Sequence, residues 1–263
     1  DLMLRSCCDH VLDGVALQRI AVIRRIATRR DLPIDEVCGL LSPINALGQG
    51  DEGEPLDLFN RVFNVGAADL DSGYFLVSSV LHPAYASDAR AQRLTLDGDL
   101  LRPERAPLRA RLSRSLHLGE RDLKAVITAF AAVAPTGDDA DALHRRLSLY
   151  YRVGKLADLL DASVGDLLNL LDVLQNDPVL RQYAGLDLLL HFDVSERADV
   201  YAMLADAEPN DALWVTQSLL WLHDWMQRQQ LSAEELKRIQ VGDRQGATAE
   251  AAAQTADLAR VNA

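Results

Sequence analysis

Helical periodicity dominates the order of apolar and polar positions along this chain. One phrase recurs four times: an amphipathic helix, a short turn, a small cap residue, an acid three positions later, and a second, more apolar helix. After the first three turns, apolar residues fall at i, i+3, i+4 and i+7, which places them on one face of a helix. These residues are Val37, Leu40, Leu41 and Ile44, then Leu123, Val126, Ile127 and Phe130, then Leu167, Leu170, Leu171 and Leu174.

The four turns, at residues 32–37, 118–123, 162–167 and 231–236, carry signals that begin helices. Serine is a preferred N-cap, and proline suits a helix start because its missing N–H needs no partner there. An acid three positions later resembles a capping box and faces the positive end of the helix dipole. We therefore predict four capping pairs: Pro33 with Glu36, Gly119 with Asp122, Ser163 with Asp166, and Ser232 with Glu235.

A helix that is apolar on one face needs partners that cover this face. The sequence therefore predicts an all-α fold of stacked, irregular helical hairpins with loop insertions. The turns are unevenly spaced along the chain, so a regular solenoid is not expected. In the fourth copy the stripe of Leu236 and Ile239 fades into a polar segment at 242–245.

Composition divides the chain into four parts. We expect a first helical hairpin over residues 1–46, a loop-rich insertion over 47–107 and helical hairpins over 108–241. An Ala-rich tail over 242–263 is either flexible or docks on sequence outside this chain. Within the insertion, residues 48–55 are loop-like and residues 56–64 favour a short helix or turn. The turn signal at 97–99, between apolar residues, leaves a small β-hairpin open.

The charge balance narrows the range of functions. The 263 residues carry a formal net charge of −12, and an acidic surface repels the phosphates of nucleic acids. No apolar run reaches the roughly 18 residues of a membrane span, so no direct span is expected. One basic stretch is interpreted as a solvated helix face or a stripe that faces a partner protein. It contains Arg102, Arg105, Arg109, Arg111 and Arg114.

Residues that could carry chemistry form no familiar pattern. The three cysteines, Cys7, Cys8 and Cys38, are an odd number with two adjacent members, which does not make a disulfide framework. None of the six histidines has a His or Cys partner at a convincing metal spacing. Phosphate-loop, nucleophile-elbow and HExxH motifs do not occur in the sequence. We therefore expect no catalytic residue, metal or cofactor, and no enzymatic activity.

Two segments leave binding interpretations open. Trp214, Trp221 and Trp225 lie at i, i+7 and i+11 on one helix face, either as core packing or as a groove for a partner. Residues 155–167 resemble a helix-turn-helix, whose second helix reads the major groove of DNA. That helix carries Asp166, Asp172 and several leucines, so it is too acidic and too apolar for this role.

Three ordered phrases carry a resemblance to a known family. Residues 19–44, followed by Pro-Leu-Asp-Leu-Phe-Asn-Arg-Val-Phe-Asn at 55–64, resemble a helical hairpin that leads into an LFDRLFN-like phrase. Residues 108–126 are similar to an hLxLxxxDL segment, and residues 147–171 to LSxLYR…LAxxLxxSVxDLLxLL. In this order, over most of residues 15–240, they resemble the helical shell of the A component (TcA) of insecticidal Tc toxins and the related virulence-plasmid A proteins. The Cys7-Cys8 start and the Ala-rich tail match no part of that pattern.

The resemblance implies a structural, non-enzymatic role. The A component assembles as a pentamer whose helical shell surrounds a central channel and carries receptor-binding domains for the host-cell surface. The complex injects a toxic enzyme that the B and C components hold. This chain would be shell that encases the channel and responds to the pH shift that opens it. Its partners would be other parts of the same subunit, and it would be secreted with the parent toxin. A stand-alone helical virulence factor that binds a host protein is the alternative.

Overall fold

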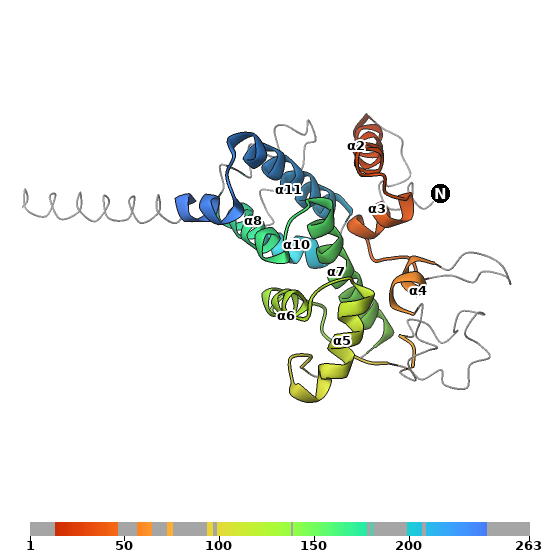
Figure 1. The fold of residues 1–263 in the computed structure, drawn as a ribbon. Helices are drawn as coiled ribbons and strands as arrows, with labels where there is room; N and C mark the ends of the chain where they lie inside the picture. The colour runs from red at the N-terminus through yellow and green to blue at the C-terminus, as the bar shows by residue number, and fades with distance from the viewer. Residues whose placement is uncertain are drawn as a thin grey trace, which may run out of the picture.

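The computed structural model describes residues 14–46, 57–64, 73–75, 94–96, 99–137, 139–177, 180, 199–206 and 209–240. Within these ranges the fold is all-α, as the periodicity predicted, and contains no strand. Residues 233–240 are also helical. The helices labelled in Figure 1 and their neighbours are α2 (Gly14–Arg30), α3 (Ile34–Leu41), α4 (Leu58–Phe63), the 3-10 helix η3 (Pro103–Arg105), α5 (Ala106–Ser115), α6 (Glu120–Ala129), α7 (Ala140–Leu159), α8 (Val164–Asn176), α10 (Val200–Asp206) and α11 (Pro209–Gln229).

The four predicted turns share one backbone geometry. The residue just before each turn is left-handed, with φ of 50° at Asp31, 53° at His117, 50° at Asp161 and 55° at Gln230. The N–H of the next residue donates to the carbonyl five positions before it, at 2.9 to 3.0 Å. This Schellman arrangement ends a helix and satisfies its last carbonyls. Glycine is the usual residue at the left-handed position, and no glycine occupies it in these turns.

The second helix of each hairpin begins three residues after the left-handed position, at residues 34, 120, 164 and 233. Ser163 Oγ accepts from the N–H of Asp166 at 3.0 Å, and the Ser163 hydroxyl donates to the Asp166 carboxylate at 2.7 Å. Ser232 and Glu235 form a reciprocal box. Ser232 Oγ accepts from the Glu235 N–H at 3.2 Å, and the Glu235 carboxylate accepts from the Ser232 N–H at 2.8 Å.

The other two predicted pairs begin their helices differently. Pro33 and Gly119 are the N-cap residues of α3 and α6, but neither has a side chain that caps an N–H. Glu36 lies in the first turn of α3 and forms an ion pair with Lys155 of α7 at 2.6 Å. It therefore ties the hairpin to its neighbour in addition to facing the helix dipole. Asp122 lies in the first turn of α6.

The predicted apolar stripes form the core of the first three hairpins. Every stripe residue after these turns is buried. Ile44 and Phe130 contribute from beyond the helices, since α3 ends three residues before Ile44 and α6 ends one residue before Phe130. The fourth hairpin differs, because Leu236 is buried whereas Ile239 is 50% exposed. The stripe of the last helix is therefore shorter than those of its counterparts.

The hairpins do not stack in the order of the chain. α3 contacts both α7 and α11, which brings the first hairpin against elements far along the sequence (Figure 1). α8 lies among α6, α7, α10 and α11 and contacts all four. Each one-sided helix thereby covers its apolar face with helices from other hairpins. None of the helices in the described ranges has the length and apolarity needed to cross a membrane.

The insertion joins the bundle through α4 and a cluster of phenylalanines. α4 lies in the segment that the sequence assigned to a short helix or turn. The ring centroids of Phe59 and Phe63 are 5.2 Å apart, and those of Phe63 and Phe75 are 6.0 Å apart. The last part of the predicted insertion is helical, because η3 begins at Pro103 and α5 at Ala106.

The described residues beside positions 97–99 do not form the small β-hairpin. The N–H of Leu94 donates instead to the carbonyl of Tyr74, at 2.9 Å. Leu100 and Leu101 lie in a turn that leads into η3. Several positions named by the sequence analysis lie outside the described residues: Cys7, Cys8, residues 97 and 98, and the Ala-rich tail.

Candidate functional site: polar cross-links between the hairpins

Polar side chains gather where the hairpins meet, and these contacts form the candidate site. In the part of the chain that the structure describes, no group of three or more His, Cys, Asp or Glu side chains is placed to hold a metal ion. Cys38, half-buried on α3, is a free thiol. Burial, and to a smaller extent the nearby Asp35, raises the pKa of this thiol, so the reactive thiolate is disfavoured there.

Arg152 makes one of these contacts from the core of the bundle. It belongs to α7, is completely buried, and donates from Nη2 to the carbonyl of Ser42 at 3.1 Å. Its Nη1 donates to the carbonyl of Leu204. Ser42 is the C-cap of α3 and Leu204 lies in the last turn of α10, so the cation meets the negative ends of two helix dipoles. Burial lowers the pKa of Arg152 to about 9, which leaves the guanidinium charged at neutral pH.

Two more side chains of α7 satisfy the backbone of Ile44. The N–H of Ile44 donates to Ser148 Oγ at 3.1 Å, and the Ser148 hydroxyl donates to the carbonyl of His144 at 2.7 Å. His144 Nε2 lies 2.6 Å from the carbonyl of Ile44. Because a carbonyl only accepts, Nε2 carries the proton in this contact. Burial lowers the pKa of His144, although the hydrogen bond to Ile44 opposes this shift, so the neutral ring fits the site.

A ladder of buried amides joins α4 to the segment at residues 73–75. Asp57 accepts from the N–H of Asn60 at 2.7 Å and from the Asn60 side-chain amide at 3.1 Å. The Asn60 amide oxygen accepts from Asn64 Nδ2 at 2.7 Å. Asn64 then pairs with both backbone groups of Phe75, accepting from the N–H at 3.0 Å and donating to the carbonyl at 3.1 Å. One asparagine thus supplies the pairing that a neighbouring strand would give a buried residue.

The structure corrects the interpretation of the basic stretch at 102–114. Arg109 and Arg111 are each only 5% exposed, so they do not belong to a solvated or partner-facing stripe. Arg111 donates to the carbonyls of Gly73 and Phe63, and its guanidinium lies 4.9 Å from the centroid of the Phe75 ring. Burial, as the main cause, lowers the pKa of Arg111 to about 10. The long side chain thus reaches the carbonyl of the last residue of α4 and a carbonyl of the segment at residues 73–75.

Arg109 and Arg146 make the same kind of contact elsewhere. Arg109 Nη1 donates to the carbonyls of Leu100 and Arg102 at 2.6 and 2.7 Å. Arg146 of α7 donates to the carbonyl of Leu96 at 2.7 Å and to two carbonyls in the loop before α7. Contacts from arginine to carbonyl therefore hold the insertion against the bundle. Of the remaining members of the basic stretch, Arg102 and Arg114 are exposed and Arg105 is half-exposed.

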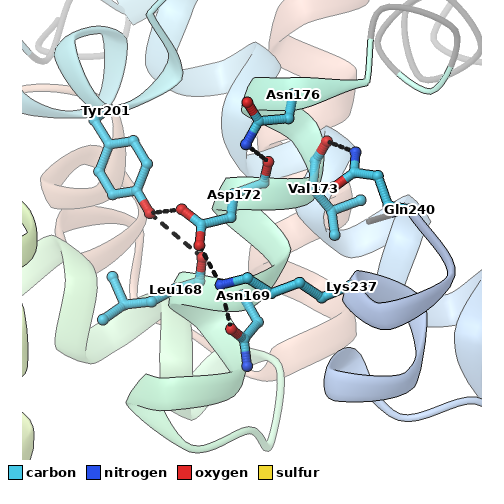
Figure 2. A network of polar contacts seen from close by, with 8 residues as sticks. All are labelled: Leu168, Asn169, Asp172, Val173, Asn176, Tyr201, Lys237 and Gln240. Atoms are coloured by element: carbon cyan, nitrogen blue, oxygen red, sulfur yellow. Dashed lines mark hydrogen bonds and ion pairs between the residues drawn. The ribbon is translucent and has the colours of Figure 1, made fainter. Parts of the chain in front are cut away.

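A further network fixes residues 233–240 on α8 (Figure 2). Lys237 Nζ donates to the Asp172 carboxylate at 2.5 Å and to Asn169 Oδ1 at 2.9 Å. The other oxygen of Asp172 accepts from the Tyr201 hydroxyl at 2.7 Å, which brings α10 to the same point. Burial, followed by the hydrogen bond to Asp172, raises the pKa of Tyr201, so the phenol remains a donor. Three elements meet at one carboxylate.

Of the two interpretations left open for the three tryptophans, core packing fits Trp214. Trp214 is 1% exposed and lies in the core of the bundle, so its ring is not available to a partner. Trp221 and Trp225 lie further along α11 and are half-buried against the same core. Core packing therefore accounts for Trp214, whereas the other two rings are partly exposed.

The environment of α8 does not suit the helix-turn-helix alternative. A recognition helix needs a free face with basic or amide donors for the major groove. α8 instead packs against four helices. Its Asp166 accepts from the capping Ser163, and its Asp172 is bound by Lys237 and Tyr201.

Sequence reasoning missed the residues that make the cross-links, although a signal for some of them was present. Arg152 interrupts an apolar stretch of α7, between Tyr151 and Val153. A charged residue that lies inside an apolar run is a candidate for a buried contact. Asn60 and Asn64, at i and i+4 beside two phenylalanines, give a similar signal.

Comparisons with known proteins add no relative to this picture. No family model, no curated protein and no solved structure matches the chain. The resemblance to the A component of Tc toxins therefore rests on the three sequence phrases alone.

Proposed function

We propose that this chain is a non-enzymatic segment of the α-helical shell of a Tc toxin A subunit, which encases the translocation channel of the assembled toxin. The proposal rests on the contacts made by polar residues in the phrases that resemble the family. Asp57 and Asn64 of the first phrase, and Ser148 and Arg152 of the third, are buried. Their polar atoms bind backbone groups, mostly of other elements.

This use of polar residues favours a framework over a reactive site. A catalytic acid or base must come within hydrogen-bond reach of a substrate. The side chains of Asn64, Ser148 and Arg152 already hold backbone groups of Phe75, Ile44 and Ser42. Polar residues in the phrases that carry the resemblance therefore hold the hairpins together.

A shell segment has to keep one arrangement of its helices while other parts of the toxin move. Apolar stripes alone are tolerant of sliding, because the hydrophobic effect has no direction. Buried hydrogen bonds are directional, and a register shift would leave their groups without partners. The contacts of Arg152 and Asn64 are of this kind, and they link segments that lie 110 and 11 positions apart.

The resemblance supplies the partners of the proposed assembly. The chain contacts other parts of the same subunit, and the subunit forms a pentamer. The B and C components deliver the toxic enzyme, and the parent toxin engages the host-cell surface after secretion. This role in virulence would need no cofactor of the chain itself.

The size of the native polypeptide tests the proposal. An antibody raised against the chain is applied to a denaturing gel and a native gel of extracts and medium from the source cells. We expect a band several times larger than 28.9 kDa on the denaturing gel, and a far larger assembly on the native gel. Prior incubation of the antibody with the purified chain is the control and must remove both bands.

A denaturing band near 28.9 kDa would contradict the shell assignment. The stand-alone virulence factor would then be the better function, because the partly exposed Trp221 and Trp225 give it a surface for a host protein. Replacement of both rings by alanine would then have to weaken capture of that protein.

A further inference from the structure

The last helix of the described bundle, residues 233–240, is held differently from its three counterparts. The apolar stripes that begin on α3, α6 and α8 are buried in full. Among residues 233–240 the only buried apolar side chains are those of Leu236 and the small Ala233, and Ile239 is 50% exposed. A glutamine, Gln240, stands where the other helices carry Leu41, Ile127 and Leu171.

Polar contacts take the place of the missing apolar ones. Lys237 binds Asp172 and Asn169 of α8, and Gln240 Nε2 donates to the carbonyl of Val173 at 3.1 Å (Figure 2). The side chains of Lys237 and Asp172 are 39% and 34% exposed. Water and salt therefore screen this ion pair, and pairs of this kind contribute little to stability.

The acceptors on α8 keep other donors when the last helix is removed. Asp172 still accepts from Tyr201 at 2.7 Å. The carbonyl of Val173 still accepts from the N–H of Asp177 at 3.0 Å, within its own chain segment. Asn169 is half-exposed, so water replaces Lys237 there. When residues 233–240 leave α8, no buried polar group of α8 therefore loses its last partner. This removes the main penalty of breaking such contacts.

We propose that residues 233–240 form a releasable strap on α8, which opens while the rest of the bundle stays folded. The strap has few apolar anchors, Ala233 and Leu236, and local opening begins where such anchors are few. Release uncovers the apolar surface of the bundle on which Ala233 and Leu236 pack.

Hydrogen exchange of the complete chain, followed by mass spectrometry, tests the strap. In the unchanged protein, amides of 233–240 should exchange well before those of α8. Lys237→Met keeps the apolar stem of the side chain and removes the ammonium group that binds Asp172 and Asn169. It should speed the exchange of 233–240 by about fivefold and leave the exchange rate of α8 unchanged. Raising sodium chloride to about 1 M should act in the same direction on the unchanged protein.

Arg238→Met is the matched control. Arg238 is the next residue on the strap and carries the same charge, but its side chain is 73% exposed and pairs with Glu234 of the strap itself. Its replacement should leave the exchange of 233–240 within about twofold of the unchanged protein. Equal acceleration by the two variants overturns the proposal, and so does exchange of 233–240 at the same rate as α8 in the unchanged chain.

Discussion

Arg152 Nη2 donates to the carbonyl of Ser42 at 3.1 Å, across 110 positions of the sequence. The same guanidinium also donates to Leu204, so one side chain of α7 holds the ends of α3 and α10. The last carbonyls of a helix have no partner within the helix. Arg152 supplies these partners and places its charge where both helix dipoles favour it.

Replacing Arg152 with methionine should lower the free energy of unfolding by about 2–4 kcal/mol. Methionine fills most of the volume of the stem but leaves the carbonyls of Ser42 and Leu204 without their donors. Arg152→Lys should also destabilise, because one ammonium does not reproduce the planar fork that spans two carbonyls. Urea unfolding followed by circular dichroism measures both variants. A methionine variant as stable as the unchanged protein would mean that burying the cation costs as much as its hydrogen bonds contribute.

Gly39 lies on α3 where three side chains pack closely against the backbone. A Cβ at this position would lie 2.9 Å from Ile44 Cγ2, 3.0 Å from Tyr151 Cε1 and 3.1 Å from Leu58 Cδ2. Gly39→Ala should therefore destabilise by about 1–3 kcal/mol, as overpacking of a core does. The same urea titration measures this loss.

Gly165→Ala is the control for Gly39→Ala. Gly165 lies in the first turn of α8, and the nearest atom to an added Cβ is Ser163 Oγ at 3.6 Å. The substitution should be neutral or should stabilise by up to about 1 kcal/mol, because alanine favours the helix. Equal losses at the two glycines would show that space around Gly39 is not the cause.

Local spacing was sufficient to predict the helices and their buried faces. Leu123 and Val126 lie on one face for any helix that contains them, because the helical period is set by the backbone. The order in which the hairpins pack could not be predicted in the same way. The contact of α3 with α11 joins segments about 170 residues apart, and nothing in either local pattern specifies the other.

The cross-links were harder to predict than the caps. Ser163 and Asp166 interact three positions apart, so their roles follow from the sequence itself. Arg111 has a long apolar stem and a charged head, which suits a solvated face as well as a buried contact. Its position became clear only from the carbonyls of Gly73 and Phe63, which lie 38 and 48 residues away.

The left-handed turns predict a stabilising substitution. Gln230 has a φ of 55°, a conformation in which a side chain of L configuration costs free energy and glycine does not. Gln230→Gly should raise the free energy of unfolding by about 0.5–1 kcal/mol and the melting temperature by about 1–4 °C. Differential scanning calorimetry measures the shift. Glycine at the neighbouring Gln227, inside α11, should instead destabilise by about 1 kcal/mol. A loss at both positions would contradict the strain at Gln230.

The cap of α8 predicts that substitutions at Ser163 and Asp166 have non-additive effects on stability. Asp166→Ala and Ser163→Ala should each cost about 1 kcal/mol, since each removes a partner of the first turn of the helix. The Ser163 hydroxyl donates to Asp166, and Asp166 N–H donates to Ser163, so the double variant should lose less than the sum of the two. Thermal unfolding of the four proteins closes the cycle. An unchanged melting temperature for Asp166→Ala would show that this carboxylate does not stabilise the start of α8.

His144 gives the fold a dependence on pH whose sign follows from its burial. Burial lowers the pKa of His144 below the ordinary value of 6.5, so the unfolded chain takes up a proton at a higher pH than the folded chain does. Stability therefore falls as the pH drops below about 6.5, until the pH reaches the folded pKa. His144→Gln keeps an N–H that can reach the carbonyl of Ile44 but does not titrate. Its unfolding free energy should decline less than that of the unchanged protein between about pH 7.5 and about pH 5, as measured in urea at each pH. Parallel declines would mean that groups other than His144 account for the acid sensitivity in this pH range.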